Sequence, residues 1–108
     1  MRYINNILNT NNKIIEFEHS IEKIIEIDDI LVVLLDLDPL NDDIINNVYG
    51  VKDGSIIWQV EDARNIFVDS PISYSYTLAR LTENNTILLT DFNGIEVSID
   101  YHTGKIIR

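Results

Sequence analysis

The sequence predicts an all-β fold, an antiparallel meander of two four-stranded units, and three observations support this prediction. First, one pattern occurs twice: residues 30–60 and 87–108 each contain an apolar strand, an alternating strand, a turn with Gly and a short Ile-rich strand. Second, a strand-like stretch and an acidic or Asn-rich turn precede each region. Third, Ala occurs only at positions 63 and 79 while Ile is abundant, so the best helix former is scarce and β-branched residues are plentiful.

We expect the 108 residues to form one domain, because a chain of this length can bury a core without disulfides. The first unit is expected at about 13–60, a connector at 61–71 and the second unit at 72–108. The two units are expected to form one small sandwich or an open sheet. The chain has no Cys, which excludes a disulfide framework, a thiolate metal site and a Cys nucleophile.

Residues 13–27 fit two patterns. Some of their apolar residues fall at helical spacing, whereas others alternate with Glu as in a half-buried strand. Because β-branched residues dominate, we favour two short strands that are broken near His19-Ser20. The alternative is an α+β fold in which residues 13–26 form a helix on the sheet.

The segment after this region predicts a buried strand and a loop. We expect a turn at 28–29 and then a strand at Ile30–Leu37 that is buried on both faces, because the run is almost continuously apolar. Asp38-Pro39 ends that strand, since Pro has no N–H to donate to a neighbouring strand. Residues 40–47 are expected to form a loop or one helical turn.

Two dipeptides predict tight hairpins. Asp53-Gly54 lies between the alternating runs 47–52 and 55–60, and Asn93-Gly94 separates two strands of the second unit. The connector between the units contains three apolar residues that are expected to fix it to the core: Ile66, Phe67 and Val68. The strands of the second unit are expected at 73–82, 86–92, 95–100 and 105–107, with the last turn at His102-Thr103-Gly104.

The aromatic residues are divided between core and surface. Trp58 and Phe92 are expected to pack in the core and against neighbouring strands. Tyr74 and Tyr76 share one face of their predicted strand at a period of two residues. That face is either fully buried or a stacked surface patch, and the sequence leaves both possibilities open.

The charge balance excludes several classes of partner. Eighteen acidic and eight basic residues give a formal net charge of −10. Nucleic acids and anionic membranes both require cations on the protein, so we expect neither as a partner. The N-terminus lacks the apolar core of a signal peptide, and the apolar run Ile30–Leu35 is too short to cross a bilayer. A cytoplasmic protein, monomeric or homodimeric, is expected.

The sequences NVYGVKDGSIIWQV and EVSIDYHTGKIIR resemble the blades of PQQ-type β-propeller repeats, in which an aspartate, a Thr-Gly turn and a Trp recur. The second segment keeps Asp100, Thr103 and Gly104, and the first keeps Gly54 and Trp58. The resemblance implies two blade-like meanders over most of the chain. Two blades do not close a propeller, so the quinone cofactor of that family is not implied, and no cofactor is expected.

The side chains that could carry chemistry form no diagnostic motif. The acidic stretch 36–43 lacks the central Gly and the downstream Glu of a calcium loop, so no metal site is predicted. Ser98, Asp100 and His102 could be drawn as a triad, but the chain has no nucleophile elbow and no phosphate loop. We therefore predict no catalytic residues and a protein that is not an enzyme.

In length, acidity and lack of Cys, the chain resembles bacterial immunity proteins that neutralise toxins, many of which are basic nucleases. The resemblance implies a non-enzymatic protein that binds and inhibits a cognate basic toxin. Six carboxylates are the predicted contacts: Asp38, Asp42, Asp43, Glu61, Asp62 and Asp69. Two alternatives remain: a self-associating interaction module whose sheet edges are exposed, and a small enzyme or ligand carrier with a deep pocket.

Overall fold

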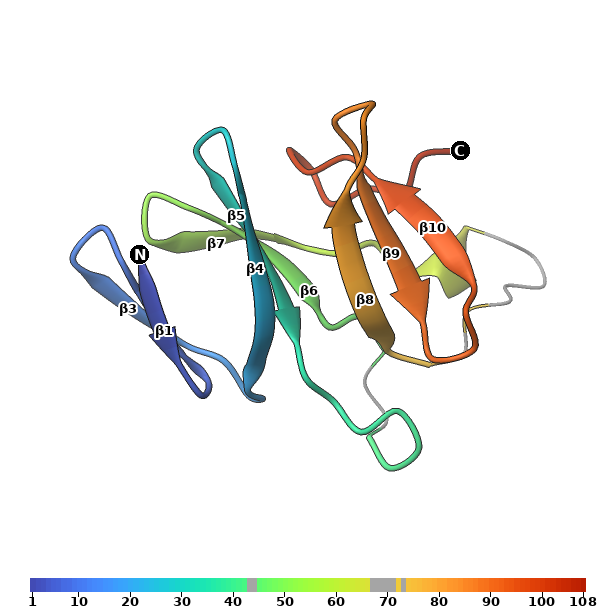
Figure 1. Ribbon diagram of the computed structural model, residues 1–108, viewed down its shortest axis with the longest axis horizontal. Helices are drawn as coiled ribbons and strands as arrows, with labels where there is room; N and C mark the ends of the chain where they lie inside the picture. Colours follow the sequence, from blue (N-terminus) through green and yellow to red (C-terminus); the bar gives the residue numbers. More distant parts are fainter. Residues whose placement is uncertain (43–44, 67–71, 73) are drawn as a thin grey trace.

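Three antiparallel sheets stack as three layers in the computed structural model, which describes residues 1–42, 45–66, 72 and 74–108 (Figure 1). The all-β prediction is confirmed. The strands of the N-terminal and central sheets are β1 (Arg2–Ile4), β2 (Ile7–Thr10), β3 (Lys13–Glu16), β4 (Ile21–Ile27), β5 (Ile30–Leu35), β6 (Val48–Lys52) and β7 (Ser55–Gln59). The C-terminal sheet contains β8 (Tyr76–Leu81), β9 (Ile87–Asp91) and β10 (Glu96–Ile99).

The central sheet, with strand order β4-β5-β6-β7, positions the other two layers. All six residues of β5 are buried, as its apolar sequence predicts, and successive side chains point to opposite faces. Ile30, Val32 and Leu34 belong to the core shared with the C-terminal sheet. Leu31, Val33 and Leu35 belong to a second core, shared with the N-terminal sheet. The buried strand therefore serves both cores.

The N-terminal sheet, with order β1-β2-β3, was not predicted from the sequence. Its turns are made by Asn: Asn5, Asn11 and Asn12 have φ values of 52°, 54° and 58°. Asn tolerates this left-handed conformation better than most residues, which accounts for part of the high Asn content. Leu8 is fully buried against the central sheet. The division of residues 13–27 into two strands is confirmed, and the helical alternative is wrong.

The C-terminal sheet, with order β10-β9-β8, is shorter than predicted. Only three of the four expected strands form, because the last segment makes a single bridge between Ile106 and Ile99. The connector begins with a 3-10 turn, η1 (Ala63–Asn65), whose buried Ala63 and neighbouring Ile66 contact the core. Phe67 and Val68 lie outside the described residues.

Both predicted Gly hairpins form, with different geometries. Asp53 and Gly54 have φ values of 52° and 77°, the combination that a two-residue hairpin requires. At Asn93-Gly94 only Gly94 is left-handed, with φ of 82°, and the N–H of Gly94 donates to the carbonyl of Asp91 over 3.0 Å. The second turn is therefore a three-residue loop that ends in a left-handed Gly.

Three local predictions are wrong. Phe92 is 48% exposed rather than buried, because it lies in the β9–β10 loop. β5 ends at Leu35, two residues earlier than expected. Tyr74 precedes β8, so it does not share a strand face with Tyr76. Tyr76 is buried and belongs to the core, whereas Tyr74 is half-buried and its ring meets that of Phe92 edge-on at 5.6 Å.

Trp58 connects the central and C-terminal layers and is buried, as predicted. Its indole Nε1 donates a hydrogen bond of 2.8 Å to the carbonyl of Tyr101. Two glycines allow the ring to fit: a Cβ added to Gly50 would lie 2.2 Å from Trp58 Cε2, and one added to Gly104 would lie 2.5 Å from Cε3. The ring is therefore held between two backbone segments.

Candidate functional site

A pocket lined by four carboxylates lies between the N-terminal sheet and two hairpin ends of the central sheet. Its volume is about 230 Å³. The side chains of Glu26, Asp28, Asp29 and Asp53 are exposed, while Leu31 and Val51 form an apolar floor. Thr10 and Asn11 of the N-terminal sheet close one wall. The pocket is concave, acidic and open to solvent.

Turn chemistry brings these carboxylates together. Asp28 has φ of 52° in the β4–β5 turn, and Asp53 has the same value in the β6–β7 turn. The two turns lie at the same end of the central sheet, because every second hairpin turn of a meander lies at the same end of the strands (Figure 1). The sequence signal was therefore present in the Asp-Asp and Asp-Gly turns. Such a signal predicts the conformation of each turn but not the pocket, because it does not show that the two turns lie side by side.

Few cations balance these acidic side chains. The ion pairs among the described residues join Arg64 to Asp62, Arg108 to Glu61 and His102 to Asp100, so none involves a pocket carboxylate. Lys13 lies beside the pocket, but its ammonium donates to the backbone carbonyl of Asp53 at 3.4 Å. The pocket therefore keeps a high density of negative charge.

The predicted acidic loop after β5 organises itself through its own carboxylates. Asp38 accepts hydrogen bonds from the N–H of Leu40 over 3.0 Å and from the amide of Asn41 over 2.5 Å. These bonds, chiefly the one from Asn41, hold the pKa of Asp38 below its usual value. Asp42 accepts from the N–H of Asp38 over 2.7 Å. The structure brings Asp38 and Asp42 together, whereas Asp43 lies outside the described residues.

The predicted connector carboxylates have partners within the protein. The guanidinium of Arg64 donates to both oxygens of Asp62, at 3.0 and 2.7 Å, and holds the pKa of that carboxyl well below its usual range. Glu61 accepts from the N–H of Ile106 over 2.9 Å and pairs with Arg108 at 3.3 Å. Asp69 lies outside the described residues. Glu61 and Asp62 therefore stabilise the chain itself.

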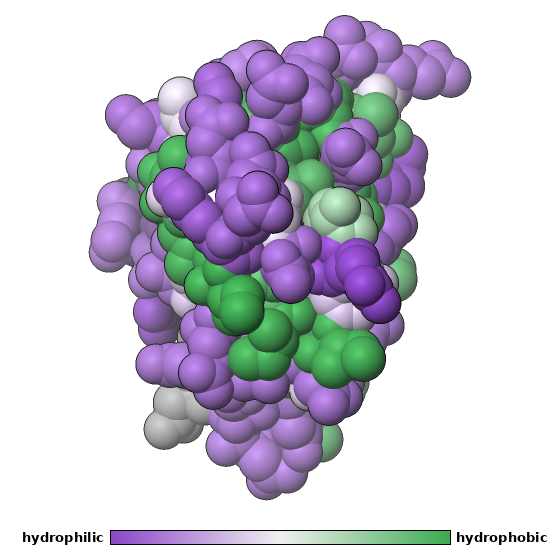
Figure 2. Space-filling view, turned by 90° about the vertical axis from the view of Figure 1, so that its left-hand side faces the viewer, coloured by the Kyte–Doolittle hydropathy of each residue, from purple (hydrophilic) through white to green (hydrophobic). Residues whose placement is uncertain are grey.

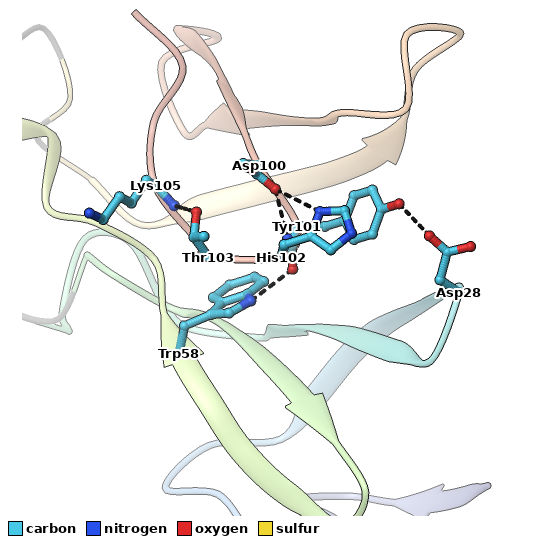
Figure 3. A network of polar contacts seen from close by, with 7 residues as sticks. All are labelled: Asp28, Trp58, Asp100, Tyr101, His102, Thr103 and Lys105. Carbon is cyan, nitrogen blue, oxygen red and sulfur yellow. Dashed lines mark hydrogen bonds and ion pairs between the residues drawn. The ribbon is translucent and has the colours of Figure 1, made fainter.

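His102 and Asp100 lie in an exposed turn next to the Trp58 contact (Figure 3). The Nδ1 atom of His102 is 3.0 Å from Asp100, whose pKa is lowered mainly by the backbone N–H of His102. The phenol of Tyr101 donates a short hydrogen bond to Asp28, which raises the pKa of Tyr101. No hydrogen bond joins Ser98 to His102 among the described residues, so these two residues and Asp100 do not form a triad. The network links the C-terminal turn to the central sheet.

The described residues contain neither a metal-binding cluster nor a membrane-spanning helix. Over 1–42, 45–66, 72 and 74–108, no group of three or more His, Cys, Asp or Glu side chains is arranged to hold a metal ion. Within the same ranges, no helix is long and apolar enough to cross a membrane. The pocket carboxylates thus surround a hollow but do not converge on one point.

These features define an all-β protein of three antiparallel layers whose most distinctive surface is an acidic pocket. The chain belongs to the family described as Domain of unknown function (DUF7957), whose model matches residues 1–108. No curated protein and no solved structure shows a significant match to the chain.

Proposed function

We propose that this chain is a non-enzymatic acidic binding protein, of the immunity type, that binds and inhibits a basic protein such as a toxin nuclease. One observation carries the proposal: on a chain of net charge −10, the four carboxylates that surround one hollow have no ion pair among the described residues. Such a surface attracts a cationic partner over long range and speeds encounter.

The acidic pocket is the proposed contact for a Lys or Arg side chain of the partner. Its apolar floor suits the methylene stem of such a side chain, while the carboxylates at its rim suit the cationic head. Three of the pocket carboxylates make no hydrogen bond with the described residues: those of Glu26, Asp29 and Asp53. Each can therefore accept a hydrogen bond from the partner. Asp28 already accepts from Tyr101 and contributes charge.

The loop carboxylates Asp38 and Asp42 have a second role in the proposal. Local hydrogen bonds fix the positions of these two carboxylates, so their negative charges stay at one place on the surface. Exposed charges at the edge of an interface change the association rate more than the dissociation rate. We therefore assign steering to the loop and contact to the pocket.

Surface plasmon resonance with a basic partner, once affinity capture has identified one, tests whether the pocket makes the contact and the loop steers association. The pocket variant Glu26→Gln/Asp29→Asn/Asp53→Asn should raise the dissociation rate at least about tenfold, since buried charge pairs act on dissociation. The loop variant Asp38→Asn/Asp42→Asn should slow association severalfold and leave dissociation within about twofold. Asp38→Asn keeps an oxygen that can cap the turn, so the loop should stay folded.

A control variant removes two charges elsewhere, as many as the loop variant and one fewer than the pocket variant. Glu83→Gln/Glu96→Gln lies on the C-terminal sheet and its turn, away from the acidic pocket, and should change neither rate beyond the effect of lost net charge. The assignment of contact to the pocket is wrong if the pocket variant loses no more affinity for each removed charge than the control does. The proposal as a whole is wrong if the affinity does not fall with added salt.

A further inference from the structure

The outer face of the N-terminal sheet carries two strongly exposed Ile side chains that no other described element covers. Antiparallel sheets that pack on one side usually alternate apolar inward and polar outward residues. Here the inner face carries the buried Leu8, yet Ile4 and Ile14 on the outer face are 72% and 70% exposed. Large apolar side chains exposed together on one face are typical of a surface that another molecule covers.

The strand register arranges this outer face as a grid of two rows and three columns. One row contains Arg2, Asn9 and Ile14, and the other contains Ile4, Ile7 and Glu16. Directly paired residues lie on the same face, and the buried Leu8 fixes which face is inner. Arg2 and Glu16 therefore occupy opposite corners, while Ile4 and Ile14 occupy the other two.

The surface over this grid is hollowed and locally neutral. A shallow hollow of about 340 Å³ is lined by Arg2, Tyr3, Ile4, Ile7 and Asn9. Figure 2, which looks onto the side of the molecule that carries the N-terminal sheet, shows apolar side chains gathered there among hydrophilic ones. The positive charge of Arg2 balances the negative charge of Glu16, so this face is neutral on a protein whose net charge is −10. The grid is thus a place where a second acidic molecule can approach.

We propose that this face binds a second copy of the same chain, forming a symmetric dimer. A two-fold axis along the diagonal from Ile4 to Ile14 places each of these side chains against its own counterpart. The same axis brings Arg2 to within about 4 Å of the grid position of Glu16 of the second copy, twice, which long side chains can span, so the face is complementary to itself in charge. A uniformly basic partner would lack this match, because one of its cations would face Arg2.

The geometry of this dimer is a known mode of sheet packing. With strands about 4.8 Å apart and about 3.4 Å per residue, the diagonal lies about 55° from the strands. The strands of the two copies then cross at about 70°, close to the orthogonal class of sheet-on-sheet packing. The grid contains only six residues, so its area is below that of stable interfaces and the dimer is weak.

Sedimentation equilibrium of the full chain tests the dimer from about 10 to about 500 µM protein at low and at high NaCl. Ten negative charges on each copy repel one another more than two exposed Arg–Glu pairs attract. Added salt screens the repulsion, so the dimer should strengthen at least about threefold between about 50 and 500 mM NaCl. A basic partner bound at the acidic pocket should respond to salt in the opposite direction.

Substitutions on the grid should follow its symmetry. Ile14→Asp should weaken the dimer at least about tenfold, whereas Leu78→Asp, at a similarly exposed apolar residue of the C-terminal sheet, should leave it unchanged. Glu16→Arg should weaken the dimer by setting two cations against each other. Adding Arg2→Glu to it should restore the dimer to within about threefold, because both pairs return in reversed order.

The inference is overturned by a chain that remains monomeric at about 500 µM in high salt. It is also overturned by a dimer that Ile14→Asp leaves intact, or by a double charge exchange that fails to restore what Glu16→Arg removes. Glu96→Arg, which changes the net charge equally on a different sheet, controls for the general effect of charge. None of these outcomes bears on the acidic pocket, so failure here leaves the proposed function standing.

Discussion

Gly50→Ala should destabilise the protein sharply, because Trp58 leaves no room for a methyl group. The added Cβ would lie 2.2 Å from Trp58 Cε2, more than 1 Å inside an ordinary contact. The ring cannot retreat, since Gly104 bounds its other side and the Tyr101 carbonyl holds Nε1 at 2.8 Å. Gly50 lies within β6 and has no left-handed φ, so the cost comes from the clash.

The expected change in the free energy of unfolding combines two costs and one gain. Overpacking of a filled core costs about 1–3 kcal/mol, and loss of the indole hydrogen bond costs about 1 kcal/mol. Ala is favoured over Gly in a strand by about 0.5–1 kcal/mol, which offsets part of this. We expect the free energy of unfolding to fall by about 2 kcal/mol, within a range of about 1–3.5 kcal/mol.

Urea unfolding followed by the fluorescence of Trp58, the single Trp, measures this change. Gly94→Ala is the matched control: its Cβ would meet nothing within 4 Å, and only its φ of 82° opposes the substitution. That control should cost about 1 kcal/mol. In a Trp58→Phe background, followed by circular dichroism, Gly50→Ala should cost less, because the smaller ring vacates the site. Equal costs for Gly50→Ala and Gly94→Ala would refute the reasoning.

Three further substitutions test single interactions by urea unfolding. Asp62→Asn keeps the turn cap but loses the charge that faces Arg64, so stability at pH 7 should fall by about 0.5 kcal/mol. The pKa of Asp62 is lowered in the folded state, so the stability that its charge contributes is complete above the ordinary carboxyl pKa of 3.8. The difference in unfolding free energy between wild type and Asp62→Asn should therefore shrink only below about pH 4. A difference that stays constant as the pH falls would contradict the ion pair. Tyr76→Phe should be neutral or stabilising by up to about 1 kcal/mol, because the buried hydroxyl has no partner among the described residues, and a clear loss of stability would show that it has one. Burial raises the pKa of Tyr76 to about 12, so between pH 10 and 12 the phenol ionises in the unfolded chain before it ionises in the folded one. The wild type should therefore lose stability over this pH range, and Tyr76→Phe should lose less. Tyr101→Phe should cost about 1–2 kcal/mol through the lost bond to Asp28, and no cost would remove this contact as a link between the layers.

The sequence predicted the elements whose signals are local. The apolar run of β5 predicted burial on both faces, and Asp53-Gly54 predicted the two-residue hairpin. The N-terminal sheet was missed because Asn-Asn turns between strands of three or four residues give weak periodicity. Phe92 was misplaced because hydrophobicity alone does not separate a strand end from a loop.

The candidate site depended on contacts that sequence distance conceals. Arg64 is two residues from Asp62, so their pairing could have been anticipated, whereas the pairing of Glu61 with Arg108 spans 47 positions. The acidic pocket joins turns near positions 11, 28 and 53, which only the stacking of two sheets brings together. The order of strands in a meander predicts that the turns near 28 and 53 lie at one end of the central sheet. It does not predict the place of the turn near 11, which belongs to another sheet.

The most direct test of the proposed function is affinity capture of this chain, tagged and expressed in its own host, at low and at moderate salt. We predict one stoichiometric basic protein that is retained at low salt, is weakened by added salt, and is lost with the Glu26→Gln/Asp29→Asn/Asp53→Asn variant. Recovery of the chain alone or only with itself, under both conditions, would contradict an acidic inhibitor.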